Sequence, residues 1–276
     1  MWCVGVDAGS RTIKAVVWDR SKHEVAARGL VNQGIRQAEL AAELVKRLLR
    51  ELGAGPGDVA RTVATGYGRT HVVHADQAVT EISCHARGGR HLHPDARMVI
   101  DIGGQDSKVI WLDPGGHVHD FVMNDRCAAG TGRFLEVVAA RLETDLAGLG
   151  EQAARSTHPV AISSTCVVFA ETEIIGLLSA RTPPADLAAG IQRAIAARIG
   201  AMVGRRAVPP ILFTGGVALV SGMAETLALT IGHVVELARD PQYTGALGAA
   251  LIAADQAEEA RARAGSRPRN DVPGGA

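Results

Sequence analysis

The chain has 276 residues, with 29 acidic and 29 basic side chains, and aromatic residues make up only 3% of it. A balanced charge gives no electrostatic basis for binding nucleic acid or an anionic membrane, and so few aromatic rings argue against a base-stacking surface. We therefore expect neither nucleic acid nor membrane as a partner. A chain of this length can bury a core large enough to fold without disulfide or metal cross-links.

The first residues, Met1 to Asp7, have the pattern of a strand that runs directly into a polar loop. No basic leader precedes an apolar run, so we expect no signal peptide and a cytoplasmic protein in which thiols stay reduced. The four cysteines are then core residues, nucleophiles or metal ligands; they are Cys3, Cys84, Cys127 and Cys166.

The sequence contains an internal repeat: the segment that begins with Asp7 resembles the segment that begins with Asp101, 94 residues later. In each copy an apolar strand ends in the aspartate, a turn of small residues follows, and a second strand carries a lysine, Lys14 or Lys108. Glycines in such turns let backbone N–H groups approach a ligand closely. Two facing turns of this kind could hold a polyphosphate, with the aspartates placed for a hydrated Mg²⁺.

Strands and helices alternate along the rest of the chain, which predicts an α/β fold with helices flanking mixed sheets. The periodicity predicts helices over 38–52, 78–89, 131–142, 167–180, 185–204, 217–230 and 243–256, and strands near 61–65, 98–101, 108–112, 118–123, 210–214 and 233–236. We expect a first half over 1–95 and a second half over 96–256, with the C-terminal helix packing back on the first half. A disordered tail is expected over 257–276.

A third glycine turn, Thr214-Gly215-Gly216, comes directly after an apolar segment and before a predicted helix. This order places backbone N–H groups and a helix N-terminus near a nucleotide. One Gly-Gly pair alone is more often only a turn, but two aspartate–glycine–lysine turns together with this one form a specific set. The set resembles the actin, sugar-kinase and heat-shock-chaperone superfamily. The resemblance implies a duplicated actin-like ATPase fold, with a nucleotide cleft between two α/β halves.

Two of the cysteines, Cys127 and Cys166, lie in polar loops of small residues just before predicted helices. The N-terminus of a helix favours a thiolate or an anionic cluster. Each cysteine lacks a Cys-x-x-Cys partner, so two ligands from each chain of a two-fold dimer would be needed to hold a four-iron cluster. Burial as small hydrophobic residues is the competing interpretation, and it is favoured for Cys3 and Cys84.

Several segments together resemble the 2-hydroxyacyl-CoA dehydratase activators, a family that includes the ATPase subunits of benzoyl-CoA reductase. The resemblance covers about residues 4–253, and its cysteine motif is more specific than its glycine turns. The matching segments are 5–10, 64–69, 81–86 (Glu-Ile-Ser-Cys-His-Ala), 101–106, 124–134, 163–166, 169–171, 214–217 and 243–250.

This resemblance implies a homodimer that binds ATP or ADP with Mg²⁺ and holds one [4Fe–4S] cluster through Cys127 and Cys166 of each chain. It also implies one-electron transfer, driven by ATP hydrolysis, from reduced ferredoxin or flavodoxin into an iron–sulfur acyl-CoA dehydratase or related reductase. The implied catalytic side chains are Asp7, Asp101 and Gln105. The implied nucleotide contacts are Gly9, Ser10, Arg11, Lys14, Gly103, Gly104, Gly130, Thr131, Gly132, Thr214, Gly215, Gly216 and Gln242.

Arg11 is a departure from the family pattern, in which the first turn more usually reads Gly-Ser-Thr. Its side chain could contact phosphate or simply face solvent. Two other functions stay open at this point: a small-molecule kinase and a regulatory ATPase of the same superfamily, neither of which would need two thiolates at helix ends.

Overall fold

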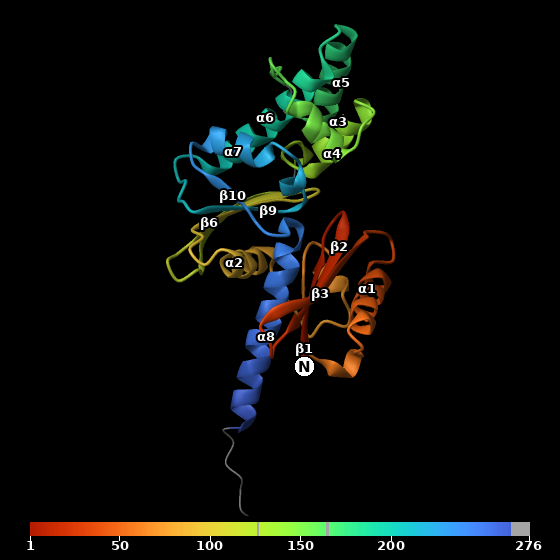
Figure 1. Ribbon diagram of the computed structural model, residues 1–276, viewed down its shortest axis with the longest axis vertical. Helices are drawn as coiled ribbons and strands as arrows, with labels where there is room; N and C mark the ends of the chain where they lie inside the picture. The colour runs from red at the N-terminus through yellow and green to blue at the C-terminus, as the bar shows by residue number, and fades with distance from the viewer. Residues whose placement is uncertain (126, 164–165, 266–276) are drawn as a thin grey trace, which may run out of the picture.

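The computed structural model describes residues 1–125, 127–163 and 166–265, which form two lobes, each built on a five-stranded mixed sheet (Figure 1). The first sheet has the order β3-β2-β1-β4-β5 and the second has the order β10-β9-β6-β7-β8. The strands of the first sheet are β1 (Trp2–Ala8), β2 (Thr12–Asp19), β3 (Glu24–Asn32), β4 (Val59–Thr65) and β5 (Gln77–Ala78). Those of the second are β6 (Met98–Ile102), β7 (Ser107–Leu112), β8 (Val118–Asn124), β9 (Ile211–Thr214) and β10 (Val235–Leu237).

The repeat seen in the sequence is also a repeat in register. In the antiparallel pair β1–β2, Asp7 is paired with Lys14, and in the antiparallel pair β6–β7, Asp101 is paired with Lys108. The first strand of each pair lies at the centre of its sheet and also has a parallel neighbour, β4 for β1 and β9 for β6. The same aspartate–turn–lysine unit therefore stands at the same place in both lobes.

The longer helices are α1 (Gln37–Glu51), α2 (Glu81–Leu92), α3 (Gly132–Arg141), α4 (Leu146–Ala153), α5 (Val167–Ser179), α6 (Pro184–Val203), α7 (Met223–Ile231) and α8 (Thr244–Gly265). Helix α1 covers one face of the first sheet, where Leu44 and Leu48 pack against inward-facing strand residues such as Val6 and Val17. Its end agrees with the sequence pattern, because Gly53 directly after the helix has a positive φ of 67°.

The other face of the first sheet is covered by the last helix of the chain. Cys3, Val16 and Trp18 form a buried cluster with α8 residues from Ala246 to Ala254. Helix α2 packs instead against the second sheet, where Ala86 joins a cluster with Val99 and other strand residues. Figure 1 shows α8 running beside the first sheet and crossing α2 beneath the second. Helix α2 therefore precedes the predicted boundary at residue 95 but also packs on the second sheet.

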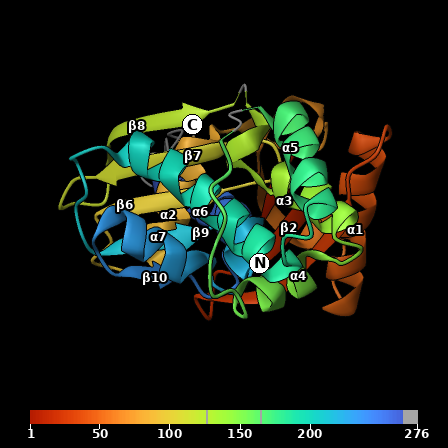
Figure 2. The ribbon, with the colours of Figure 1, turned by 90° about the horizontal axis from the view of Figure 1, so that it is seen from above.

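The upper face of the second sheet carries the remaining helices. Helix α6 lies across this sheet, with α3, α4 and α5 gathered at one end of it (Figure 2). The buried residues Ile191, Ile195 and Ile199 of α6 share one apolar cluster with Ile100 and Phe213 of the strands. This cluster fixes the position of α3 and α5, the helices that follow the two loop cysteines.

Three differences from the sequence-based expectations have physical causes. Strand β3 was not predicted, because its partly buried residues lack a clear alternation, and the short helix α4 was missed in a segment rich in glycine and alanine. Helix α8 continues to Gly265, so the predicted start of a disordered tail at residue 257 is too early.

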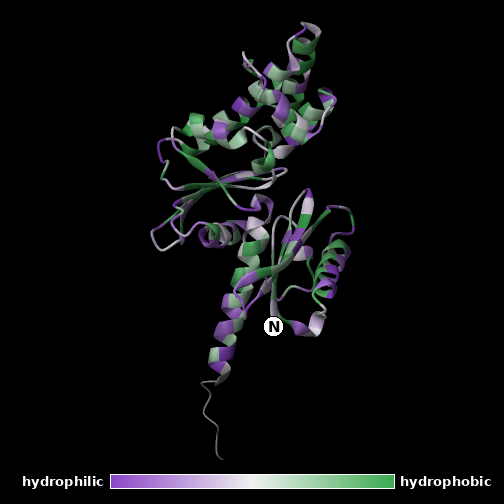
Figure 3. Cartoon of the chain, viewed as in Figure 1, coloured by the Kyte–Doolittle hydropathy of each residue, from purple (hydrophilic) through white to green (hydrophobic). Residues whose placement is uncertain are grey.

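The charged residues that suggested a tail form the solvated end of α8, which Figure 3 shows changing from apolar to hydrophilic along its length. The rest of the predicted tail, 266–276, lies outside the described residues. Among the helices that the structure describes, none combines the length and apolar character needed to span a bilayer.

Candidate functional site

The segment from Asp7 to Lys14, predicted to bind phosphate and called the first phosphate turn, joins β1 to β2. A neighbouring loop packs behind it. Lys14 Nζ lies 3.4 Å from Asp7 Oδ2, so the lysine and the aspartate of the turn form an ion pair. The loop after β4 packs directly behind, since a Cβ atom at Gly66 would lie only 2.5 Å from Asp7 Oδ1. Gly66 has a φ of 91°, which favours glycine on its own account. The carboxylate of Asp7 is thus held between the lysine and a tightly packed backbone.

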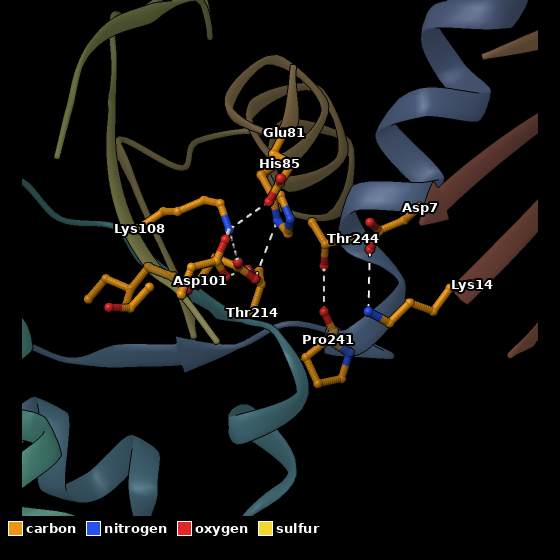
Figure 4. Close-up of polar contacts among 12 residues, drawn as sticks. Asp7, Lys14, Glu81, His85, Asp101, Lys108, Thr214, Pro241 and Thr244 are labelled. Atoms are coloured by element: carbon orange, nitrogen blue, oxygen red, sulfur yellow. Dashed lines mark hydrogen bonds and ion pairs between the residues drawn. The ribbon is translucent and has the colours of Figure 1, made fainter. Parts of the chain in front are cut away.

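The corresponding segment from Asp101 to Lys108, called the second phosphate turn, joins β6 to β7. It holds a denser group of charged side chains (Figure 4). Lys108 Nζ lies 3.3 Å from Asp101 Oδ2, 2.7 Å from Asp106 Oδ2 and 2.8 Å from Glu81 Oε2. The lysine side chain is only 1% exposed. Glu81 reaches this position from the first turn of α2, so the helix contributes a charge to the phosphate turn.

These contacts set the protonation of the group. Burial by itself would raise the pKa of Asp101, but the electrostatic influence of His85, Lys108 and Lys14 holds that pKa down to about 2. Burial likewise works against the charge on Lys108, yet the carboxylates around it raise its pKa. Burial raises the pKa of Glu81, and Lys108 opposes that rise. The second turn therefore places a buried lysine among three carboxyl groups, whose oxygen atoms are ligands of the kind that a divalent cation prefers.

His85 lies one helical turn after Glu81, on the same face of α2, and extends the charged group toward the first lobe. Its Nδ1 atom is 3.5 Å from Asp101 Oδ1, and the side chain is buried. A Cβ atom at Gly245 would lie 3.0 Å from His85 Nε2 and 3.4 Å from Asp7 Oδ2. The glycine at the start of α8 thus leaves room for a histidine that lies between the aspartates of the two turns.

The third glycine turn follows β9 and contacts the second phosphate turn from below. The hydroxyl of Thr214 is buried and donates a hydrogen bond of 3.1 Å to Asp101 Oδ1. Gly215 has a φ of 92°, and its N–H donates to the carbonyl of Pro241, next to Gln242. Of the two glycines in this turn, only Gly216 would have open space around a Cβ atom. Thr214 therefore supports Asp101, and the free surface of this turn lies at Gly216.

The first residues of α3 are joined to the second phosphate turn by backbone hydrogen bonds. The N–H of Gly132 donates to the carbonyl of Gly103, and the N–H of Arg133 donates to the carbonyl of Gly104. Thr131, which precedes them, is fully buried. The predicted nucleotide contact Gly132 is therefore hydrogen-bonded directly to the turn that contains Gly103 and Gly104, and Gly130 and Thr131 precede it in the chain.

The remaining predicted residues of the two turns are more accessible. Ser10 is half-buried, Arg11 is exposed, and Gln105 is exposed at the turn between β6 and β7. Arg11 reaches across to α3, where its guanidinium pairs with Glu136 at 3.0 Å. The structure therefore brings the predicted residues of both turns together at the junction of the lobes.

The cysteines divide as expected into two kinds. Cys3 and Cys84 are fully buried, and burial raises the pKa of the Cys84 thiol to about 12. Cys166 is exposed at the N-cap position of α5. Cys127 is half-buried and begins the short 3₁₀ turn Ala128–Gly130 that leads into α3. Within the described ranges of one chain, no group of three or more His, Cys, Asp or Glu side chains could hold a metal ion.

Glu81, His85 and Lys108 were not predicted as site residues. Lys108 is the counterpart of Lys14 in the repeat, so the repeat itself carried a signal that could have found it. Glu81 and His85 stand four residues apart in a helix that places both on one face, beside the buried Cys84. Two ionisable side chains on the buried face of an amphipathic helix are a signal of a polar site.

The comparisons with known proteins agree with this geometry. Residues 4–253 match the model of the BadF/BadG/BcrA/BcrD ATPase family. The chain belongs to this ATPase family. The activator of lactoyl-CoA dehydratase from Anaerotignum propionicum is 43% identical to this family member over 94% of this chain and 100% of its own length.

Two solved structures are also similar to this family member. The activator of 2-hydroxyisocaproyl-CoA dehydratase from Clostridium difficile, solved with bound ADPNP, has a TM-score of 0.90 at 40% identity, covering 95% of this chain and 98% of that one. Component A of (R)-2-hydroxyglutaryl-CoA dehydratase from Acidaminococcus fermentans has a TM-score of 0.88 at 42% identity, covering 94% and 99%. The predicted family and the predicted duplicated actin-like ATPase fold are both confirmed.

Proposed function

We propose that this ATPase is an activator that delivers single electrons to an iron–sulfur acyl-CoA dehydratase or a related reductase. Three relatives that match over nearly their full length are named as activators of acyl-CoA dehydratases. The observation that carries the proposal in this chain is the pair of accessible cysteines at the starts of helical segments, Cys127 and Cys166. A kinase or a regulatory ATPase of the same fold has no use for two such thiolates.

The proposed nucleotide site lies between the two phosphate turns. Gly9, Ser10, Arg11 and Lys14 of one turn, with Gly103 and Gly104 of the other, would bind the phosphates of ATP. Asp7 and Asp101 would hold a hydrated Mg²⁺, which neutralises phosphate charge when bound. Gln105 would orient the attacking water, and its exposure in the turn leaves its amide available for that task. Gly216 and Gln242 would contact the adenosine.

The proposed cluster site uses two chains. The donor chemistry fits, because thiolates are the ligands that iron–sulfur clusters prefer. Cys166, at the N-cap of α5, also lies at the positive end of a helix dipole, which favours a thiolate. One chain offers two such thiols, and four are needed, so two copies would share one [4Fe–4S] cluster across a two-fold axis. When bound, this cluster supplies the one-electron chemistry. The chain itself holds the thiolates, and through α3 it links Cys127 to the second phosphate turn.

The electron would come from reduced ferredoxin or flavodoxin, and the protein would work in the cytoplasm. The coupling would rest on the backbone hydrogen bonds from Gly132 and Arg133 to Gly103 and Gly104. Through them, a change of the phosphate turn on ATP hydrolysis reaches the segment that carries Cys127. Exposure and hydrogen bonding at the thiolates set the potential of a cluster, so such a movement can change the driving force for electron transfer.

The test is the iron and sulfide content and the absorption spectrum of protein purified without oxygen. The wild type should be brown and dimeric, with one four-iron cluster per dimer, and the variant C127A/C166A should be colourless. The matched control is Cys84→Ala, which removes a buried thiol and should keep the colour. A wild type that stays colourless after reconstitution, yet hydrolyses ATP, would replace this proposal with the kinase or regulatory ATPase.

A further inference from the structure

Among the contacts that the structure describes for the first phosphate turn, the side chain of Arg11 is the one that touches the second lobe. A Cβ atom at Gly104 would lie 2.2 Å from Arg11 Cγ and 3.0 Å from Arg11 Cβ. The alkyl part of the arginine therefore lies directly on the backbone of the second phosphate turn. A side chain at position 104 would exclude it, so the glycine provides the surface on which the arginine rests.

The guanidinium at the end of this side chain binds helix α3. Arg11 Nε lies 3.1 Å and Arg11 Nη2 lies 3.0 Å from Glu136 Oε1. The other carboxylate oxygen, Glu136 Oε2, accepts a hydrogen bond of 3.0 Å from Arg133 Nη1. Glu136 is thus shared between an arginine of its own helix and an arginine of the opposite lobe, and it keeps a cationic partner when Arg11 leaves.

These contacts close a ring of three parts: the first phosphate turn, the second phosphate turn and the start of α3. The second turn and α3 are already joined by the hydrogen bonds from Gly132 and Arg133. Arg11 alone supplies the side-chain ion pair that joins the first turn to that unit among the described residues. Its guanidinium is half-exposed, and exposed ion pairs of this kind are weak.

We propose that Arg11 responds to the nucleotide by exchanging Glu136 for phosphate oxygens. A guanidinium binds phosphate in a bidentate manner, whereas both contacts of Arg11 with Glu136 go to one carboxylate oxygen and Arg133 takes the other. The stem of Arg11 crosses between the two turns, where the phosphates of ATP would lie. Binding of a triphosphate therefore draws Arg11 inward, breaks its contact with Glu136 and frees α3 from the first lobe.

This inference rests on the proposed nucleotide site but not on the proposed cluster. Its consequence for Cys127 follows from the chain, because only the 3₁₀ turn Ala128–Gly130 and Thr131 separate that cysteine from α3. The exchange at Arg11 would then signal the state of the nucleotide to the segment that carries the cysteine. ADP, which has no γ-phosphate, would draw Arg11 less strongly.

The test measures dissociation constants for a non-hydrolysable ATP analogue and for ADP by calorimetry on the full chain. Arg11→Thr should weaken binding of the ATP analogue by about tenfold, as loss of a charge-assisted contact does, and weaken ADP less. Glu136→Gln should strengthen binding of the ATP analogue several-fold, because Arg11 no longer has a competing partner. In the Arg11→Thr background, Glu136→Gln should have no effect.

The matched control is Arg36→Gln, which removes a comparable surface ion pair with Glu39 on the first lobe and should leave both constants unchanged. Equal effects of Glu136→Gln with and without Arg11 would overturn the exchange. So would an Arg11→Thr variant that binds the ATP analogue as the wild type does. A colourless protein would refute the cluster proposal and would leave this result unaffected, because the readout is nucleotide affinity alone.

Discussion

At the scale of single side chains, the two lysines of the repeat differ in what surrounds them. Lys14 pairs with one carboxylate, that of Asp7, whereas Lys108 is fully buried among Asp101, Asp106 and Glu81. The repeat in the sequence predicts the shared aspartate pairing. It does not predict Glu81, because that side chain arrives from a helix outside the repeated segment. The asymmetry gives the second turn the larger excess of negative charge.

The substitution Lys108→Met tests how far the protein depends on this buried cation. Removing one partner of a buried ionic group leaves uncompensated charge, and we expect a loss of about 3–5 kcal/mol in the free energy of unfolding. The measurement is urea denaturation at neutral pH. Lys14→Met is the control: its pair is partly exposed, so its loss should be smaller. Equal losses in the two variants would contradict the picture of a buried network in the second turn.

At the scale of elements, the crossing of α2 and α8 depends on close backbone contact. A Cβ atom at Gly248 would lie 1.7 Å from the carbonyl oxygen of Cys84, and one at Gly88 would lie 2.2 Å from that of Thr244. Small residues recur every three to four positions over 242–250, a spacing that permits close packing against another helix or against an adenine. The structure shows helix packing at Gly248, and the same contact keeps Glu81 and His85 in the site.

Gly248→Ala should therefore disturb the crossing. Overpacking in a filled core typically costs about 1–3 kcal/mol, and a contact with backbone leaves little room to relax. Thermal unfolding with circular dichroism would measure the loss. Gly176→Ala in α5 is the matched change, because a Cβ atom there meets nothing within 4 Å. It should stabilise the helix by about 0.5–1 kcal/mol. Stabilisation by both changes would show that the crossing is looser than described.

The positions of several helices and turns could be predicted from the sequence. The periodicity predicts α1 and α6 within a residue at each end, and the turns after β1 and β6 follow from the aspartate and glycine pattern. For the other helices, the sheet that each one covers could not be read, because apolar spacing shows that a face is buried but not against which partner. The C-terminal helix was expected to pack back on the first half, and α8 does contact Trp18 there.

At the scale of the whole molecule, each sheet is covered in part by a helix that is remote from it in the sequence or belongs in sequence to the other lobe. The first sheet is covered by α8, and α2, which follows the first sheet in sequence, packs on the second. Neither lobe therefore has a complete core of its own. The two turns proposed to bind the nucleotide lie at the junction between the lobes, next to these two helices (Figure 4).

We expect the two lobes to unfold together. Trp111 reports on the second lobe and Trp18 on the first, and both are buried. Fluorescence unfolding of W111F follows the first lobe, where Trp2 also lies, while the double variant W2F/W18F follows the second. Because the lobes share α2 and α8, each variant should show one transition, and its midpoint by fluorescence should match its midpoint by circular dichroism. If the midpoint by fluorescence differs from the midpoint by circular dichroism in either variant, the lobes do not share a core.

The late position of α8 has a consequence for the order of events on the ribosome. The strands of the first sheet are complete by Ala78, yet the helix that covers Val16 and Trp18 begins only at Thr244. At a synthesis rate of about 5–20 residues per second, one apolar face of that sheet waits roughly 10–30 s for its cover. A nascent chain of this protein therefore offers a binding site to a chaperone for most of its synthesis, and the site closes as the last helix emerges.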